Sequence, residues 1–193
     1  MDSAEIELAK LGLAHAQAAA KFAVAFMEAQ SRLELAGITS AERLTSAEGL
    51  ARSRETLAQL VELMARHKEG YATLVTRSTA ASLAASEALP PGRREEYQAN
   101  LRRSRERGLT LQGRFYAARQ RWLDAVATTL DCAEQHADAI WREGDVLVCD
   151  SDEVLAVLQA AARAMDEASA EETLIMQQRQ ADIAADLQRM AGS

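Results

Sequence analysis

The sequence predicts an all-α protein, an elongated antiparallel bundle of four long helices that forms a single domain over residues 1–193. Alanine, leucine and glutamate are abundant, and the chain has only two prolines and nine glycines, so it is rich in helix formers and poor in helix breakers. Clear stop and start signals divide the chain at three points. Its length is sufficient for one domain with a hydrophobic core.

Three breaks are expected, near residues 37–39, 90–92 and 144–150. Gly37 can end a helix. Pro90 and Pro91 cannot continue a helix, and Gly144 permits a stop before the last segment. The expected helices are therefore 3–36, 40–89, 93–143 and 151–190.

The connections between these helices are short, which predicts that sequential helices pack in an up-down-up-down order. At 1.5 Å per residue the two middle helices would each be about 75 Å long. The apolar run DVLVC at 145–149 could form a strand. No second strand is predicted, so we expect a loop packed on the end of the bundle.

Several classes of protein are excluded by composition. Cys132 and Cys149 are too few for a disulfide framework or a zinc site. The most apolar stretch, residues 11–29, contains charged and polar side chains and fails as a membrane span. The first residues are acidic where a secretory signal is basic. We therefore expect a soluble, cytoplasmic protein.

No enzymatic chemistry is indicated. A di-iron site in a bundle needs glutamate three residues before histidine, but Gly12, Met64 and Ala133 precede the three histidines. His136 and Cys132 alone make an incomplete metal shell. Phosphate-binding loops with the GxxxxGK[ST] or GxGxxG pattern are absent from the sequence. We expect a non-enzymatic protein with no cofactor and no metal.

The first helix carries two apolar stripes on nearly opposite sides, although a peripheral helix needs only one. One stripe consists of Ile6, Leu13, Ala20, Val24, Met27 and Leu35. The other consists of Leu8, Leu11, His15, Phe22, Phe26, Ala29 and Leu33. Either this helix is wedged between neighbouring helices, or the second stripe joins another subunit or a partner helix. The candidate interface residues are Leu11, Phe22, Phe26 and Leu33.

Residues 102–122 hold seven arginines and one acid in a chain with a net charge of −7. One outward strip contains Arg103, Arg107, Arg114 and Arg121. We expect a solvated face, partly neutralised by acids of the last helix, and no nucleic-acid site, because exposed aromatics do not alternate with the arginines. The strip is a candidate for weak contact with an anionic membrane or an acidic protein.

Polar residues also recur every seven positions inside the apolar faces of the last two helices. They are Arg105, Gln112 and Arg119 in one helix and Glu172, Arg179 and Asp186 in the other. Antiparallel packing would bring Arg119 near Glu172, and Arg105 near Asp186. This pattern predicts either a polar network that sets the register of the helices or a core site in which the arginines bind a small anion.

These patterns lead to three hypotheses about function. The first is a non-enzymatic interaction protein, such as a scaffold, adaptor or assembly subunit, that binds a protein partner or its own copies through the first helix. The second is a peripheral membrane or curvature-binding dimeric helical rod. The third is a sensor or carrier with an anion site in the bundle core.

Overall fold

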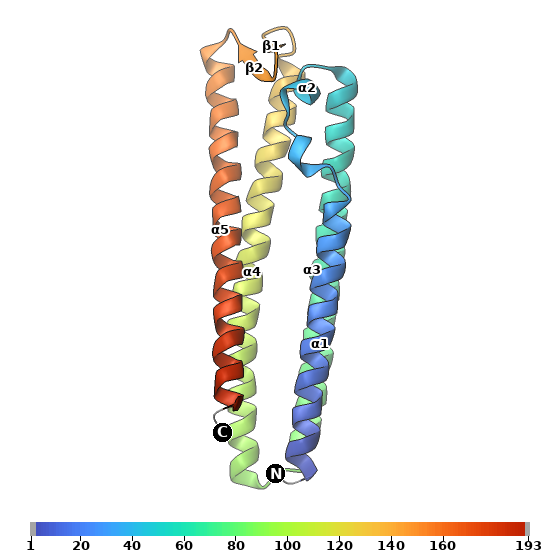
Figure 1. Ribbon diagram of the computed structural model, residues 1–193, viewed down its shortest axis with the longest axis vertical. Coiled ribbons are helices and arrows are strands. Elements are labelled where there is room, and N and C mark those ends of the chain that lie inside the picture. The colour runs from blue at the N-terminus through green and yellow to red at the C-terminus, as the bar shows by residue number, and fades with distance from the viewer. Residues whose placement is uncertain (1–2, 192–193) are drawn as a thin grey trace. The chain divides into compact units, whose positions relative to one another are not determined.

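The computed structural model describes residues 3–191, with side chains for all of these except Ile183 and residues 186–191. Over this range the protein is an all-α helical bundle that is 85% helical, with four long helices and one short one (Figure 1). This confirms the predicted fold class.

The breaks between the long helices lie close to the predicted positions. In chain order the elements are α1 Ser3–Ser31, the 3₁₀ turn η1 Leu35–Gly37, α2 Ala41–Leu44, α3 Ala47–Ser86, α4 Pro91–Gln135, β1 Ile140–Glu143, β2 Val146–Cys149 and α5 Asp152–Ala191. Pro91 occupies the first position of α4, where its missing N–H has no helical partner in any case.

Contacts between Cα atoms divide the chain into two units. The first contains the chain up to Arg32, which includes α1, together with Glu62–Thr110. The second contains Leu33–Val61 together with the chain from Leu111 onward. Helices α3 and α4 each contribute residues to both units. The prediction of a single domain is neither confirmed nor contradicted by this division.

In the first unit, α1 runs antiparallel to the second half of α3 and parallel to the first half of α4. Phe22 of α1 stacks on His67 of α3, with ring centroids 4.8 Å apart, and Phe26 packs on the same imidazole at 4.2 Å. On the other side, Arg105 of α4 contacts His15 of α1 at 2.6 Å. The aromatic side chains of α1 therefore pack against α3, and His15 of α1 contacts α4.

In the second unit, α4 and α5 run antiparallel, as their cross-helix contacts show. Residue 121 of α4 pairs with residue 171 of α5, and residue 112 pairs with residue 179. Near the β-hairpin the core contains Ile38, Leu44, Val126, Leu130, Cys132, Ala133, Ile140 and Val154. This cluster ties α4 to the hairpin, to α2 and to the start of α5.

The interpretation of 145–149 as an unpaired loop is wrong. Ile140–Glu143, expected to end the third helix, instead forms an antiparallel strand with Val146–Cys149, with Ile140 opposite Cys149. Gly144 adopts a φ of 63°, which a two-residue hairpin turn with glycine first requires. Helix α4 ends eight residues early because Ile140 is buried in the core as part of a strand.

The predicted helices 3–36 and 40–89 are also interrupted. Helix α1 ends at Ser31, and a break at residues 45–46 separates the short α2 from α3. The Thr45 hydroxyl donates to the carbonyl of Ala41 at 2.8 Å, while the Ser46 hydroxyl accepts the backbone N–H of Gly49 at 3.1 Å. These local hydrogen bonds end one helix and begin the next.

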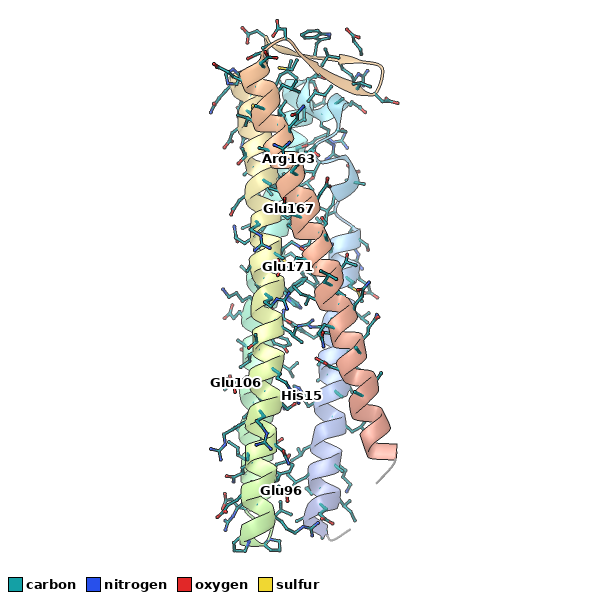
Figure 2. The ribbon with its side chains drawn as sticks, turned by 90° about the vertical axis from the view of Figure 1, so that its left-hand side faces the viewer. His15, Glu96, Glu106, Arg163, Glu167 and Glu171 are labelled. Atoms are coloured by element: carbon teal, nitrogen blue, oxygen red, sulfur yellow. The ribbon has the colours of Figure 1, made fainter. Side chains whose placement is uncertain are left out.

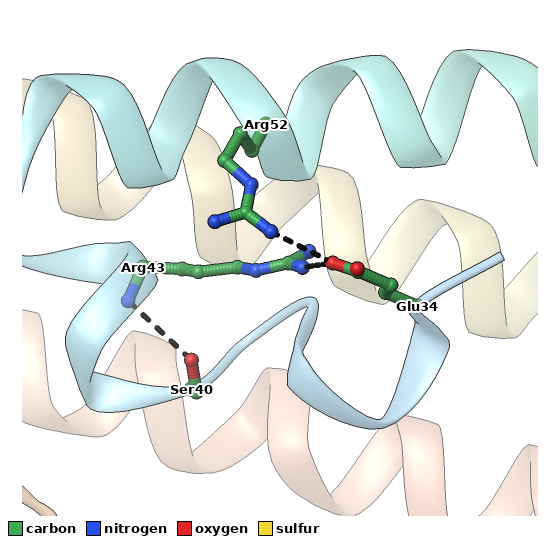
Figure 3. A network of polar contacts seen from close by, with 4 residues as sticks. All are labelled: Glu34, Ser40, Arg43 and Arg52. Atoms are coloured by element: carbon green, nitrogen blue, oxygen red, sulfur yellow. Dashed lines mark hydrogen bonds and ion pairs between the residues drawn. The ribbon is translucent and has the colours of Figure 1, made fainter.

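A polar network holds the connection between α1 and α3 (Figure 3). The carboxylate of Glu34 accepts hydrogen bonds from Arg43, which is buried, and from Arg52 of α3 at 2.9 Å. Ser40 begins α2 by accepting the backbone N–H of Arg43 at 3.4 Å. Gly49 is needed here, because a Cβ at this position would lie 2.5 Å from the Cα of Arg43.

Candidate functional site

The predicted interface stripe of α1 faces the inside of the first unit. Phe26 is buried, and the side chains of Leu11 and Phe22 are partly buried. The fourth predicted residue, Leu33, is partly buried but lies beyond the end of α1 and belongs to the second unit. Gly70 of α3 permits the close approach of Phe22, because a Cβ at this glycine would lie 2.6 Å from the ring. Phe22 and Phe26 therefore pack within their own chain, as expected for a helix wedged between its neighbours. Association of this stripe with another subunit stays a prediction.

The exposed apolar side chains of α1 belong to the opposite stripe. Leu13 is 61% exposed and Met27 is 53% exposed, and Ile6 and Val24 are also exposed. Gly12, beside them, has open space around it. A helix with large apolar side chains on its exposed face offers a surface to another helix.

Spacing along this face follows a strict alternation of three and four residues. The positions are Ile6, Ala9, Leu13, Ala16, Ala20, Ala23 and Met27, all exposed and all uncharged. This is the heptad pattern of a coiled coil, in which the first and fourth positions of each heptad meet a partner helix. We call these seven residues the α1 seam.

The large members of the seam, Ile6, Leu13 and Met27, belong to the first of the two stripes that the sequence predicts, whereas its heptad spacing was not predicted. Four of the seven positions are alanine, and alanine is so common in this chain that it did not stand out as a contact residue. The detectable signal was the spacing. Alanines at every second seam position allow two helix backbones to approach closely.

All four arginines of the predicted outward strip are exposed. In the second unit, Glu171 of α5, labelled in Figure 2, accepts hydrogen bonds from Arg121 at 2.6 Å and from Arg114 at 3.4 Å. In the first unit, Arg103 donates to Asn100 at 2.6 Å. Arg114 and Arg121 thus share one carboxylate, which neutralises at most one of the four positive charges at short range.

The buried polar residues of α4 and α5 partly follow the predicted pairing. Arg119 donates to Glu172 at 2.5 Å, and the two side chains are only 11% and 14% exposed. The Arg119 guanidinium also lies over the Trp122 ring, 5.8 Å from its centroid. Next along the helices, Arg179 donates to the buried Gln112.

Arg105 has a different partner. Its guanidinium contacts the Nε2 atom of His15, and the predicted neighbour Asp186 lies outside the residues whose side chains are described. An arginine only donates hydrogen bonds, so Nε2 of His15 is the acceptor and the imidazole is neutral. Burial, and then the charge of Arg105, lower the pKa of His15.

Among the described residues, no group of three or more histidine, cysteine, aspartate or glutamate side chains could hold a metal ion. In the same part of the chain, no helix is long and apolar enough to cross a membrane. No protein-family model, curated protein or solved structure matches this chain.

Proposed function

We propose that this chain is a non-enzymatic assembly protein that self-associates through the α1 seam. The observation that carries the proposal is the exposed, uncharged heptad face of α1. Burying such a face against an apolar partner is favourable by roughly 25 cal/mol for each Å² of apolar surface.

A second copy of the same helix is the occupant that fits this face. In an antiparallel pair related by a two-fold axis, Met27 of one copy lies opposite Ala9 of the other, and Leu13 opposite Ala23. Each of these large side chains then meets an alanine, so the surface is complementary to itself.

The charges beside the seam agree with this arrangement. Lys10 and Glu28 are 18 residues apart, which is five helical turns, so they lie on the same flank of α1. In the antiparallel register, Lys10 of one copy lies about 3 Å along the axis from Glu28 of the other. Two symmetry-related ion pairs would therefore border the interface.

The test is the mass of the purified protein by light scattering, with 21.0 kDa expected for a single chain. Leu13→Glu should weaken the dimer at least tenfold, since it buries an unpaired charge in the seam (about 1.4 kcal/mol for each factor of ten). Leu174→Glu is the matched control, because Leu174 of α5 is 60% exposed and lies outside the seam. A wild-type monomer, or equal weakening by both variants, would contradict the proposal.

A charge reversal tests the antiparallel register separately. Lys10→Glu should weaken the dimer, and adding Glu28→Lys to it should restore affinity, because opposite charges face each other again. If the double variant does not regain dimer affinity, this antiparallel register is excluded. Self-association through the seam is tested separately by Leu13→Glu.

A further inference from the structure

Arg105 is a half-buried arginine that has no acidic partner among the described side chains. Arg119 has Glu172 as its counterion, whereas the hydrogen-bond partner of Arg105 is the neutral imidazole of His15. Its Nε atom is buried without a hydrogen-bond partner. Burial lowers the pKa of the Arg105 guanidinium, which indicates that its charge is poorly solvated. A nearby negative charge would offset the cost of burying this guanidinium.

A groove lies beside this arginine within the first unit. It has a volume of about 600 Å³, is open to solvent, and is lined by Thr79, Arg102, Arg105, Glu106, Leu109 and Thr110. Arg102 lies one turn before Arg105 on the same face of α4. Its guanidinium donates only to the backbone carbonyl of Gln98, at 3.3 Å, within the described part of the chain. Two arginines that have no acidic partner among the described side chains therefore border one groove.

The other lining groups fit a ligand with phosphate oxygens. The hydroxyl of Thr79 on α3 is covered and has no hydrogen-bond partner, so a small side-chain movement would provide a further donor. Leu109, 48% exposed, provides an apolar wall. Glu106 is the one acid among the lining residues, and its carboxylate forms no ion pair in the described part of the chain. Figure 2 shows His15 on α1 and Glu106 on α4.

We propose that this groove binds a phosphate-type oxyanion through Arg102 and Arg105. The planar guanidinium matches two oxygens of a phosphate at once, and two such groups on adjacent turns can hold three oxygens. His15 is a positioning residue, because its neutral Nε2 accepts one N–H of Arg105 and leaves the remaining donors for the ligand. This site uses no residue of the α1 seam, so it is independent of self-association.

The test is isothermal titration of the full chain with inorganic phosphate at constant ionic strength. Saturable binding is expected, and Arg102→Gln should weaken it at least about tenfold through loss of charged hydrogen bonds. Arg102 is exposed, so this variant should fold. The matched control Arg103→Gln removes the same charge from a neighbouring residue outside the groove, and phosphate affinity should not change. Glu106→Gln should tighten binding, because it removes a repulsive charge.

Sedimentation with phosphatidylcholine vesicles that contain phosphatidic acid distinguishes the source of the phosphate group. Cosedimentation that is lost in Arg102→Gln and kept in Arg103→Gln supports a lipid headgroup. Binding of inorganic phosphate without cosedimentation supports a soluble phosphate ester. Absence of saturable phosphate binding, or equal losses in Arg102→Gln and Arg103→Gln, overturns the proposal, and the light-scattering mass reports self-association separately.

Discussion

Arg119 and Glu172 form an ion pair that is almost fully covered by the surrounding side chains. Each has one further buried atom without a hydrogen-bond partner, Nε of Arg119 and Oε1 of Glu172. Such a pair contributes little net stability, because desolvation offsets the attraction between the charges. Removing one partner is costly, since the other charge is then left alone.

Arg119→Met should therefore lower the free energy of unfolding by about 3–5 kcal/mol at a pH where Glu172 is charged. Arg114→Met is the control, because its contact with Glu171 is exposed and such pairs contribute less than about 1 kcal/mol. Urea unfolding of the two variants measures both values. Equal, small effects would mean that the Arg119–Glu172 pair is solvated.

The same pair predicts a pH dependence. Burial raises the pKa of Glu172 above its ordinary value of 4.5, and the attraction of Arg119 opposes this only in part. The folded chain thus holds this proton more tightly than the unfolded chain. The tighter binding of this proton stabilises the folded chain below pH 4.5, and this stabilisation is lost as pH rises through the raised pKa of Glu172.

Comparison with Glu172→Gln isolates this effect, because glutamine has a similar shape and does not titrate. As pH rises from below 4.5 to neutral, the wild type should lose stability relative to the variant. Urea unfolding across this range measures the difference. A relative gain by the wild type would show that attraction to Arg119 dominates over burial.

At the scale of elements, the short connection from α2 to α3 depends on one glycine. A Cβ at Gly49 would lie 2.5 Å from both the Cα and the carbonyl oxygen of Arg43, and backbone atoms cannot move aside as a flexible side chain can. The same Arg43 is hydrogen-bonded to Glu34 (Figure 3). Displacing its backbone would disturb the whole connection.

Gly49→Ala should therefore destabilise the protein by about 1–3 kcal/mol, the usual cost of overpacking. Gly113→Ala should instead stabilise the protein. Gly113 lies inside α4 with nothing within 4 Å of the added Cβ, and alanine is favoured over glycine in a helix by about 1 kcal/mol. Thermal unfolding of both variants measures the contrast, and destabilisation by both would contradict the argument.

At the scale of the whole molecule, charge is unevenly distributed along the chain. From Arg93 to Arg121 there are nine arginines and three glutamates, although the complete chain has a net charge of −7. Glu171 neutralises part of this basic segment through Arg114 and Arg121. Most of the arginines in this segment are exposed.

We therefore expect only weak, general attraction to duplex nucleic acid and to vesicles of phosphatidylserine. It should vanish near about 0.15 M salt, where charges more than about 8 Å apart are largely screened. Sedimentation and filter binding over a salt series measure this. Tight binding that survives this salt, and is lost when Arg103, Arg107, Arg114 and Arg121 become glutamine, would instead identify the strip as the functional surface.

Local sequence was sufficient for the helical class and for the approximate breaks near Gly37, Pro90 and Gly144, because helix propensity, capping and proline geometry act over a few residues. Seven-residue spacing was sufficient to suggest that Arg119 and Glu172 meet. The alanines of the α1 seam differ from the other alanines of the chain only in their heptad spacing, because alanine has no distinctive side-chain chemistry.

Long-range packing determined the features that local patterns could not. Two stripes of α1 are nearly equally apolar, so only the stacking of Phe22 and Phe26 on His67 showed which one is covered. Residues 140–143 became a strand because they pair with 146–149 and bury Ile140. Arg105 and Arg119 have the same local pattern, but one meets a neutral histidine and the other a carboxylate. The partner of a side chain lies on a helix that is distant in sequence. The free energy of that contact contributes only once the helices have packed together, so local sequence patterns do not contain it.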